Sequence, residues 1–343
     1  MEESRFCNKI HWFTFFFSLL VIWVHSANAE TYLGWRDDTH FLFILQNYVG
    51  NVAAQVSVPG FFMISSYLFY RNFSMDRLIQ KWTTRISTIL VPFILWNFLY
   101  YMGYVLASRI PGLRDVVGKE IVPFNLMAAG DAILHYTYNY VFWYLYQLIL
   151  LILLAPAIYF VVKRPWLAAV AGATILWAIG HGYRLVYLNL DALLYYGTAA
   201  CFAVHEKGMV EKKWNCRRMA AGIFTAGIGM GCLWLSASGI RVVWLVLFRL
   251  LIPIALWLMT PEGKLPAAKS WMKDNFFLYA VHFAIVRLIN KTGAEILPPT
   301  VAVPLILYIF MPLFCVSLSS LMAAVIKSYA PPVWRILTGG RNS

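Results

Sequence analysis

Long apolar stretches constrain this chain more than any other feature, because about 20 consecutive apolar residues allow a helix to cross the hydrocarbon core of a bilayer. Only 13% of the 343 residues are charged and 61% are hydrophobic, whereas a soluble domain has about a quarter charged residues. We therefore expect an all-α integral membrane protein, a bundle of about ten transmembrane helices. The expected spans are 11–30, 50–70, 86–107, 140–162, 165–181, 185–204, 219–237, 242–259, 275–290 and 300–326.

The basic residues predict the orientation of these spans, since Lys and Arg gather in cytoplasmic loops. With a cytoplasmic N-terminus, 19 of the 28 Lys and Arg residues fall on the cytoplasmic side and 7 on the outer side. Both termini are therefore expected in the cytoplasm. This placement accounts for the net charge of +13, so the lipid bilayer is the expected partner and nucleic acid is not.

Domain organisation and cysteine content are simple. No repeat or linker interrupts the chain, and residues 1–343 are expected to form a single polytopic domain. The cysteines have no CxxC spacing, so neither a disulfide framework nor a metal site is predicted. They are Cys7, Cys201, Cys216, Cys232 and Cys315.

The stretch VIWVHSANAE, residues 21–30, has two interpretations. Residues 27–29 have the A-x-A form of a cleavage site, which would make everything before Glu30 a discarded secretion signal. The apolar core of a signal is about 7–15 residues long, whereas the run from Ile10 to Ala27 has 18 residues. We therefore expect the first span to be retained, with His25 in its outer half.

Titratable side chains inside the spans are candidates for function, since each costs at least ~2.5–3.5 kcal/mol near the membrane centre. A neutral imidazole can take a proton from a hydroxyl near neutral pH, or it can be a core histidine hydrogen-bonded to a neighbouring helix. Asp191 and Arg249 can form a buried ion pair or line a proton or substrate pathway, and Glu30 can be a helix-end charge. The residues of this kind are His25, Glu30, Asp191, Arg249, His282 and Arg287.

A basic face and an aromatic segment complete the candidate features. Arg77, Lys81 and Arg85 are four residues apart, so on a helix they share one face at the cytoplasmic entrance of the third span. They can anchor the topology or cradle a phosphorylated cofactor. Tyr136–Tyr146 is interpreted as an interfacial aromatic belt that can also stack against a sugar.

Several stretches together resemble a known family. They are VIWVHS at the end of the first span, VPGFFMISSYLFYRNF (58–73), KWTTRISTILVPFILWN (81–97), WYLYQLILLILLAPAIY (143–159) and FFLYAVHFAIV (276–286). In order and spacing they resemble the first, second, third and two later helices of the membrane-bound acyltransferase-3 family. The resemblance covers most of the chain and is weakest over 200–260.

The resemblance implies a function. Members of the family are inner-membrane proteins of roughly ten helices that transfer acyl groups, mostly acetyl from cytoplasmic acetyl-CoA, to hydroxyls of cell-surface or exported glycans. It implies that His25 is catalytic, as a base or as a carrier of the acetyl group, and that Arg85, with Lys81, holds the CoA phosphates. The resemblance also implies partners in glycan assembly or export. The candidate supporting residues are Ser26, Asn28, Glu30, Asp191, Arg249 and His282, of which Ser26, Asn28 and Arg249 are candidate oxyanion donors.

This sequence departs from the family pattern at three positions. Thr14 stands where an arginine often precedes the histidine by eleven residues, Thr88 stands near a second basic-run arginine, and Ser66 replaces a glycine. Lys9 or Arg5 is a candidate substitute for the first arginine. A glycan transporter or flippase, or a non-catalytic subunit of a glycan-export complex, are the alternatives. Dependence on acetyl-CoA separates an enzyme from a carrier.

Overall fold

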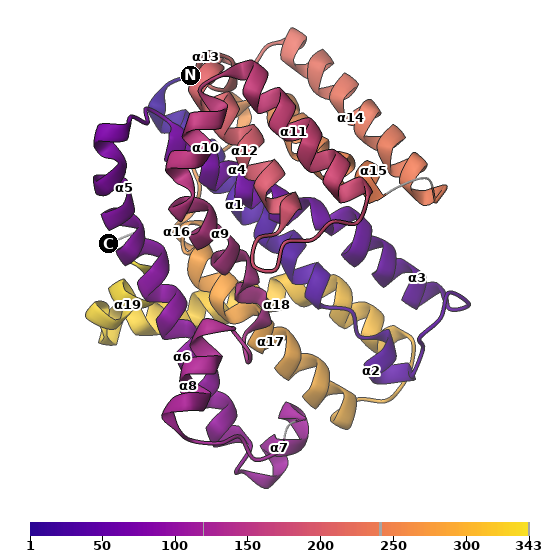
Figure 1. The fold of residues 1–343 in the computed structure, drawn as a ribbon. Coiled ribbons are helices and arrows are strands. Elements are labelled where there is room, and N and C mark those ends of the chain that lie inside the picture. The colour runs from indigo at the N-terminus through magenta and orange to yellow at the C-terminus, as the bar shows by residue number, and fades with distance from the viewer. Residues whose placement is uncertain (119, 240–241, 342–343) are drawn as a thin grey trace. The chain divides into compact units, whose positions relative to one another are not determined.

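The computed structural model describes residues 1–118, 120–239 and 242–341 (Figure 1). Every regular element in these ranges is a helix, so the expected all-helical class is confirmed. Six described helical segments are long and apolar enough to cross a membrane, and a bent pair, Tyr140–Leu153 with Ala155–Val162, makes a seventh if it is one span. The six are Glu3–Leu33, Phe41–Tyr70, Met75–Ala107, Cys216–Ala237, Val242–Met259 and Ala302–Tyr329.

The chain folds as two compact units. Unit 1 consists of residues 1–17, 54–82 and 150–272, and unit 2 of residues 18–53, 83–149 and 273–343. Four helices have residues in both units: α1 (Glu3–His25), α5 (Leu78–Arg85), α9 (Trp143–Leu153) and α16 (Ser270–Lys273). The units are described separately below.

Unit 1 is built on close helix pairs. In Figure 1, α14 and α15 run side by side, and two glycines allow this approach. A Cβ atom on Gly222 would lie 2.5 Å from Met259 Cγ, and one on Gly229 would lie 2.9 Å from Ile252 Cδ1. Small residues permit such contacts between membrane helices. The α-helices that lie wholly or mostly in unit 1 are α4 (Ser57–Tyr70), α10 (Ala155–Val162), α11 (Pro165–Gly180), α12 (Leu190–His205), α13 (Lys207–Val210), α14 (Cys216–Ala237), α15 (Val242–Met259) and α16 (Ser270–Lys273).

Ser66, which replaces a glycine of the family pattern, has a structural role of its own. Its hydroxyl is fully buried between α4 and α12 and donates a hydrogen bond of 2.6 Å to the Tyr196 carbonyl. The serine therefore joins two helices at a position where glycine would only allow them to approach.

The expected span 140–162 is not one straight helix. It bends by 66° at Leu154, between α9 and α10. Pro156 has no N–H to donate to the Ile152 carbonyl four residues earlier. That carbonyl instead accepts a hydrogen bond of 2.8 Å from the Trp82 indole. The bend thus has a local cause, and its freed acceptor is satisfied by a side chain.

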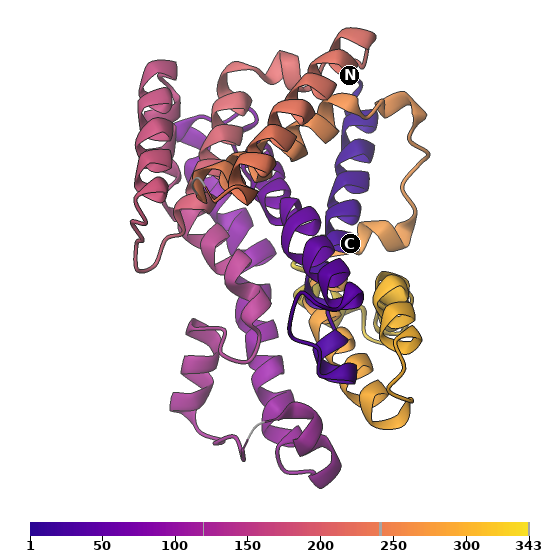
Figure 2. The ribbon, with the colours of Figure 1, turned by 90° about the vertical axis from the view of Figure 1, so that its right-hand side faces the viewer.

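Unit 2 is organised around α6 (Val91–Ala107), α17 (Asn275–Ile296) and α18 (Ala302–Tyr329). α17 packs against α18, as the lower right of Figure 2 shows, and the C-terminal helix α19 (Pro331–Thr338) packs against α6. The Trp96 indole of α6 donates to the Leu337 carbonyl at 3.0 Å, and Trp334 lies against Phe277, with ring centroids 5.1 Å apart. The remaining helices are α2 (Ala29–Leu33), α3 (Phe41–Tyr48), the π-helices η1 (Val49–Ala53) and η4 (Ile86–Leu90), α7 (Pro111–Val117), α8 (Leu126–Leu134) and the short 3₁₀ helix η5 (Tyr140–Phe142).

Arg71, just after α4, clamps three parts of unit 1. Its guanidinium makes paired hydrogen bonds of 2.7 and 2.9 Å to Glu211 and two bonds of 2.6 Å to Glu3. Tyr67 also donates to Glu211, at 2.8 Å. Burial opposes the ionisation of Glu211, but the bonds from Arg71 and Tyr67 outweigh it and hold the pKa of this carboxyl below its ordinary value.

Arg71→Ala should destabilise unit 1, because it leaves the partly buried Glu211 carboxylate without its cation. We expect a loss of about 2 kcal/mol, measured as a lower melting temperature of the purified protein in detergent. The contribution of Glu211 is present above the ordinary carboxyl pKa and is lost as the pH falls through its lowered pKa, so the variants should converge in acid. Arg77→Ala, which removes an exposed arginine nearby, should leave the melting temperature unchanged. Equal shifts in the two variants would contradict the clamp.

Candidate active site

His25 is the last residue of α1 and is held by a residue far away in the sequence. The phenol oxygen of Tyr140, the first residue of η5, lies 2.9 Å from His25 Nδ1. The two rings meet edge to face, with centroids 5.5 Å apart. This contact within unit 2 fixes the orientation of the imidazole.

The hydrogen bond to Tyr140 also determines which nitrogen can accept a proton. When His25 Nδ1–H donates to the phenol oxygen, Nε2 has the free lone pair that a general base needs. When the phenol donates to Nδ1, Nε2 carries the hydrogen and only donates. Because a tyrosine hydroxyl can both donate and accept, the pair admits the tautomer in which Nε2 is the base.

His282 of α17 lies beside His25. The two imidazole centroids are 5.5 Å apart, and His282 is fully buried. Its Nδ1 lies 2.6 Å from the Tyr279 carbonyl, and since a carbonyl only accepts, this nitrogen carries the hydrogen. Nε2 therefore has the lone pair, and it is buried without a hydrogen-bond partner among the residues described. Two histidines with available lone pairs can thus handle a proton at one place.

A cluster of side-chain amides secures the chain where α1 ends. The Gln46 carbonyl oxygen accepts from the backbone N–H groups of Asn28 and Ala29 at 2.9 and 3.0 Å. The Gln46 amide donates to the Asn28 side chain at 2.7 Å, and Asn28 donates to Asn290 of α17 at 3.2 Å. Asn290 donates in turn to the Ser26 carbonyl at 3.4 Å. Amides from α3 and α17 therefore hold the turn that follows His25.

A cavity of about 410 Å³ lies in unit 2 and is lined in part by Phe283, the residue after His282. Phe283 links the cavity to the site, because its ring lies 5.8 Å from that of His25 and 4.5 Å from that of Tyr140. Arg287 lines the cavity and donates to the Tyr104 hydroxyl at 2.8 Å. Trp96, Tyr100 and Tyr104 add aromatic rings to the wall, and the rest of the described lining is apolar and not aromatic.

Asn139 is a further polar group close to His25 in the fold. It directly precedes Tyr140 and is fully buried, and neither atom of its side-chain amide has a hydrogen-bond partner among the residues described. A buried amide without partners is costly. The amide is therefore a candidate to bind a polar group of a substrate.

The basic residues of the sequence analysis have different surroundings. The Lys81 ammonium donates to the Phe69 carbonyl at the end of α4 and lies over the Phe69 ring, 5.3 Å from its centroid. Its charge thus caps a helix C-terminus, where cations are favoured. Arg85 ends α5 and belongs to unit 2, directly before η4, and Arg77 is exposed.

The remaining candidate residues fall into two groups. Asp191 and Arg249 belong to unit 1, and no ion pair within 4 Å joins them in the described structure. The buried ion pair, one of the two interpretations of these residues, is therefore not formed in the described structure, and Arg249 Nε is buried without a hydrogen-bond partner there. Glu30 forms an exposed ion pair with Arg36 at 2.9 Å, as a helix-end charge does.

Ser26 and Asn28 act on the protein itself. The Ser26 hydroxyl donates to the Ile22 carbonyl of its own helix at 2.5 Å, and the Asn28 amide belongs to the cluster described above. Their donor hydrogens are therefore engaged in holding the end of α1.

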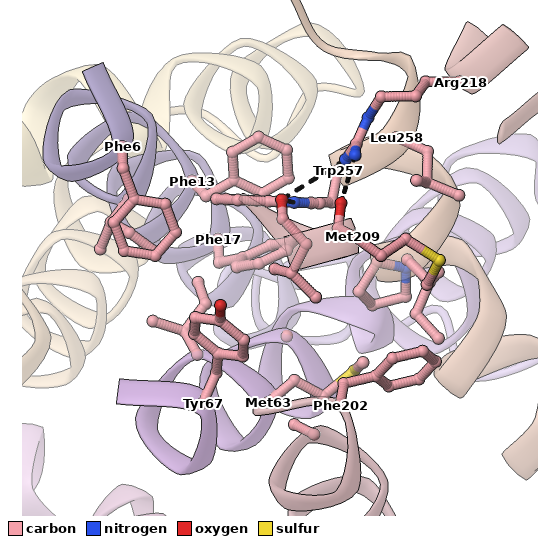
Figure 3. Close-up of a pocket in the computed structure, with 17 residues that line it drawn as sticks. Phe6, Phe13, Phe17, Met63, Tyr67, Phe202, Met209, Arg218, Trp257 and Leu258 are labelled. Carbon is pink, nitrogen blue, oxygen red and sulfur yellow. Dashed lines mark hydrogen bonds between the residues drawn. The ribbon is translucent and has the colours of Figure 1, made fainter. Parts of the chain in front are cut away.

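Unit 1 contains an apolar pocket of about 130 Å³ (Figure 3). Figure 3 shows phenylalanines of α1 and Trp257 of α15 around it, while the Arg218 guanidinium turns to the carbonyls of Met209 and Val210. Among the residues described, its lining includes no histidine, carboxylate, serine or cysteine. This pocket suits a hydrocarbon group, and the chemistry-bearing side chains gather in unit 2.

Four polar residues of the site are absent from the sequence-based predictions. Asn139 and Tyr140 lie in the stretch interpreted as an aromatic belt. Gln46 and Asn290 lie in apolar helices and carry no charge, so the search for titratable groups passes over them. The available signal is their polarity, because a side-chain amide in an apolar helix needs a partner.

Comparison with known proteins gives one match. The family model described as an acyltransferase domain, that of the acyltransferase 3 family, matches residues 8–323. The range contains His25, Arg85, Tyr140 and His282 and ends before α19. No curated protein matches the chain, and no solved structure matches it.

Gln46→Ala should loosen the turn after His25, because two backbone N–H groups and the Asn28 side chain lose their partner. Each unsatisfied buried group costs about 1–3 kcal/mol, so we expect a loss of at least about 2 kcal/mol in stability. Thermal unfolding of the purified protein measures this. Asn47→Ala removes the neighbouring, exposed amide and should have little effect. A Gln46→Ala protein as stable as the Asn47→Ala protein would show that the cluster does not hold the turn.

Proposed function

The chain belongs to the acyltransferase 3 family, and on this premise we propose that it transfers an acetyl group from cytoplasmic acetyl-CoA to a hydroxyl of a cell-surface or exported polysaccharide. The observation that carries the proposal is the pairing of His25 with Tyr140 and His282 inside the matched domain. The family makes the protein a membrane acyltransferase. The donor and the acceptor class are the proposed part.

His25 is the proposed general base. A sugar hydroxyl attacks the thioester carbonyl of acetyl-CoA while His25 Nε2 takes the hydroxyl proton, and a C–O bond forms. The C–S bond then breaks, and the leaving thiolate receives the proton from the imidazolium. The products are an O-acetyl ester and CoA, so no further reactant is needed. Tyr140 holds the required tautomer by accepting from Nδ1–H.

His282 and Asn139 have supporting roles in this proposal. The buried lone pair on His282 Nε2 can accept a hydrogen bond from the attacking hydroxyl or from protonated His25. The Asn139 amide can donate to the oxygen on which negative charge develops. These roles use the polar groups of unit 2 that the protein leaves without partners.

The cavity that Phe283 links to His25 is the proposed acceptor site. Sugars present apolar faces that stack on aromatic rings, and hydroxyls that need polar partners. Phe283 and the tyrosines supply the rings, while Arg287 and Tyr104 supply hydrogen-bonding groups. Acetyl-CoA would approach from the cytoplasm, with Arg85, and to a lesser degree Lys81, binding its phosphates.

The membrane topology and location that we propose are those predicted from the sequence. We propose ten spans in one polytopic domain, cytoplasmic termini and residence in the cell inner membrane. Seven segments are long and apolar enough to cross a membrane when the bent pair is counted as one span, and the shorter apolar helix α11, with α12 and α17, would complete the ten. Partners in glycan assembly or export would present the acceptor.

His25→Ala should reduce acetyl transfer by at least ~10²–10⁴-fold, since a positioned base contributes about this much. The protein should remain folded, because alanine is well tolerated in a membrane helix. O-acetyl content of surface glycans in cells with wild type, His25→Ala or no protein provides the test. His181→Ala, a change at an exposed histidine, should behave as wild type. Normal acetylation with His25→Ala would refute the assignment.

Tyr140→Phe keeps the ring and removes the partner of His25 Nδ1. Loss of one hydrogen bond is worth about 1 kcal/mol, so kcat should fall about fivefold to tenfold. KM for acetyl-CoA should change little, because the tyrosine acts on the base and not on the donor. Tyr183→Phe, at an exposed tyrosine, is the matched control. A change confined to KM would contradict the positioning role of Tyr140.

A further inference from the structure

The chain just beyond α19 packs against the π-helix η4, within unit 2. Gly339 and Gly340 both have left-handed backbone conformations, with φ of 66° and 71°. A Cβ atom on Gly339 would lie 2.6 Å from Thr88 Cα and 2.8 Å from the Ser87 carbonyl oxygen. Only glycine allows this turn and this approach. The turn leads the chain to Arg341, which is outside the matched acyltransferase domain.

Arg341 is held in one position by two contacts. Its guanidinium donates to the Thr88 carbonyl at 2.5 Å and lies over the Phe276 ring, 4.1 Å from the centroid. Thr88 is in η4, and Pro92, four residues later, has no N–H with which to satisfy that carbonyl in an α-helix. The carbonyl thus gives the guanidinium a fixed partner, and π-helical turns are frequent at functional sites.

Arg85 ends α5 three residues before Thr88, so the guanidinium held at the Thr88 carbonyl lies within about one helical turn of a second arginine. Burial, followed by the positive charge of Arg85, lowers the pKa of Arg341 to about 10, so it remains protonated at neutral pH. No carboxylate forms an ion pair with Arg341 within the described structure, and its contacts there are a carbonyl and an aromatic ring. Two neighbouring guanidinium groups repel each other, and an anion that binds to both offsets this repulsion.

We infer that Arg341 joins Arg85 in binding a phosphate group of the acyl donor. Arg341 lies beyond the family domain and completes this site. It places a guanidinium beside Thr88, where the family resemblance predicts an arginine that the sequence lacks. Phosphate is the expected anion because it accepts paired hydrogen bonds from the planar forks of two arginines. The inference rests on the proposed function in taking CoA as the source of this phosphate.

The test is calorimetric binding of CoA to the purified protein in neutral detergent. Arg341→Ala should weaken binding about tenfold or more, because it removes a charge-assisted contact to phosphate. Arg341→Gln is the sharper variant. It retains a donor for the Thr88 carbonyl but removes the charge, so affinity should fall as in Arg341→Ala while the melting temperature stays at the wild-type value. Arg335→Ala, which removes an exposed arginine of α19, is the matched control and should bind CoA normally.

Further probes identify the phosphate and separate the two proposals. If 3′-dephospho-CoA binds wild type and Arg341→Gln equally, the 3′-phosphate is the group held; if the difference persists, the diphosphate is held, and both results support the inference. Equal CoA binding by wild type and Arg341→Gln would overturn the role of Arg341 and leave the proposed donor intact. No CoA binding by wild type would overturn the proposed donor as well. In nanodiscs, a loss of phosphatidylglycerol binding without a loss of CoA binding would identify a lipid headgroup site and overturn the inference.

Discussion

The hydrogen bonds of Gln46 are the interaction on which the candidate site depends. A helix that ends in an apolar medium leaves backbone groups without water to bind, and each such group costs free energy. Gln46 accepts from two backbone N–H groups just after His25 and donates to Asn28, which continues to Asn290. With the turn fixed in this way, α1 can stop at His25, and the imidazole is presented at a helix end, where Tyr140 orients it.

Cations in this protein often act on carbonyl groups at helix ends and turns. Lys9 is buried and donates to the Trp257 and Thr260 carbonyls at the end of α15, both at 2.7 Å, and Lys81 donates to the Phe69 carbonyl at the end of α4. Helix C-termini carry partial negative charge, so these cations offset exposed acceptors without a carboxylate. A basic residue in a membrane helix is therefore weak evidence for ligand binding until its carbonyl partners are known.

Features of the fold that depend on hydropathy could be predicted from the sequence, whereas features that depend on tertiary contacts could not. The all-helical class was predictable, and the expected span 242–259 coincides with α15. Extra helices such as α2 and α3 and the bend at Leu154 were missed, because they depend on local breaks and on side chains like Trp82 that satisfy freed acceptors. His25 was predictable because a titratable side chain in a membrane span is costly. The roles of Tyr140 and Gln46 were not predictable, because they depend on contacts at the end of α1 that form only in the folded chain.

The departures from the family pattern have different structural meanings. Thr14 is uncharged, and its hydroxyl donates to carbonyls of its own helix. Lys9, a candidate to replace the missing arginine, donates its ammonium hydrogens to carbonyls at the end of α15 and so does not replace the charge at that position. At Thr88 the structure brings Arg341 to the backbone of the altered position. A charge needed at a site can come from any segment that the fold delivers there, since electrostatic binding depends on position and not on chain order. A motif that is incomplete in sequence is therefore no evidence that the site is incomplete.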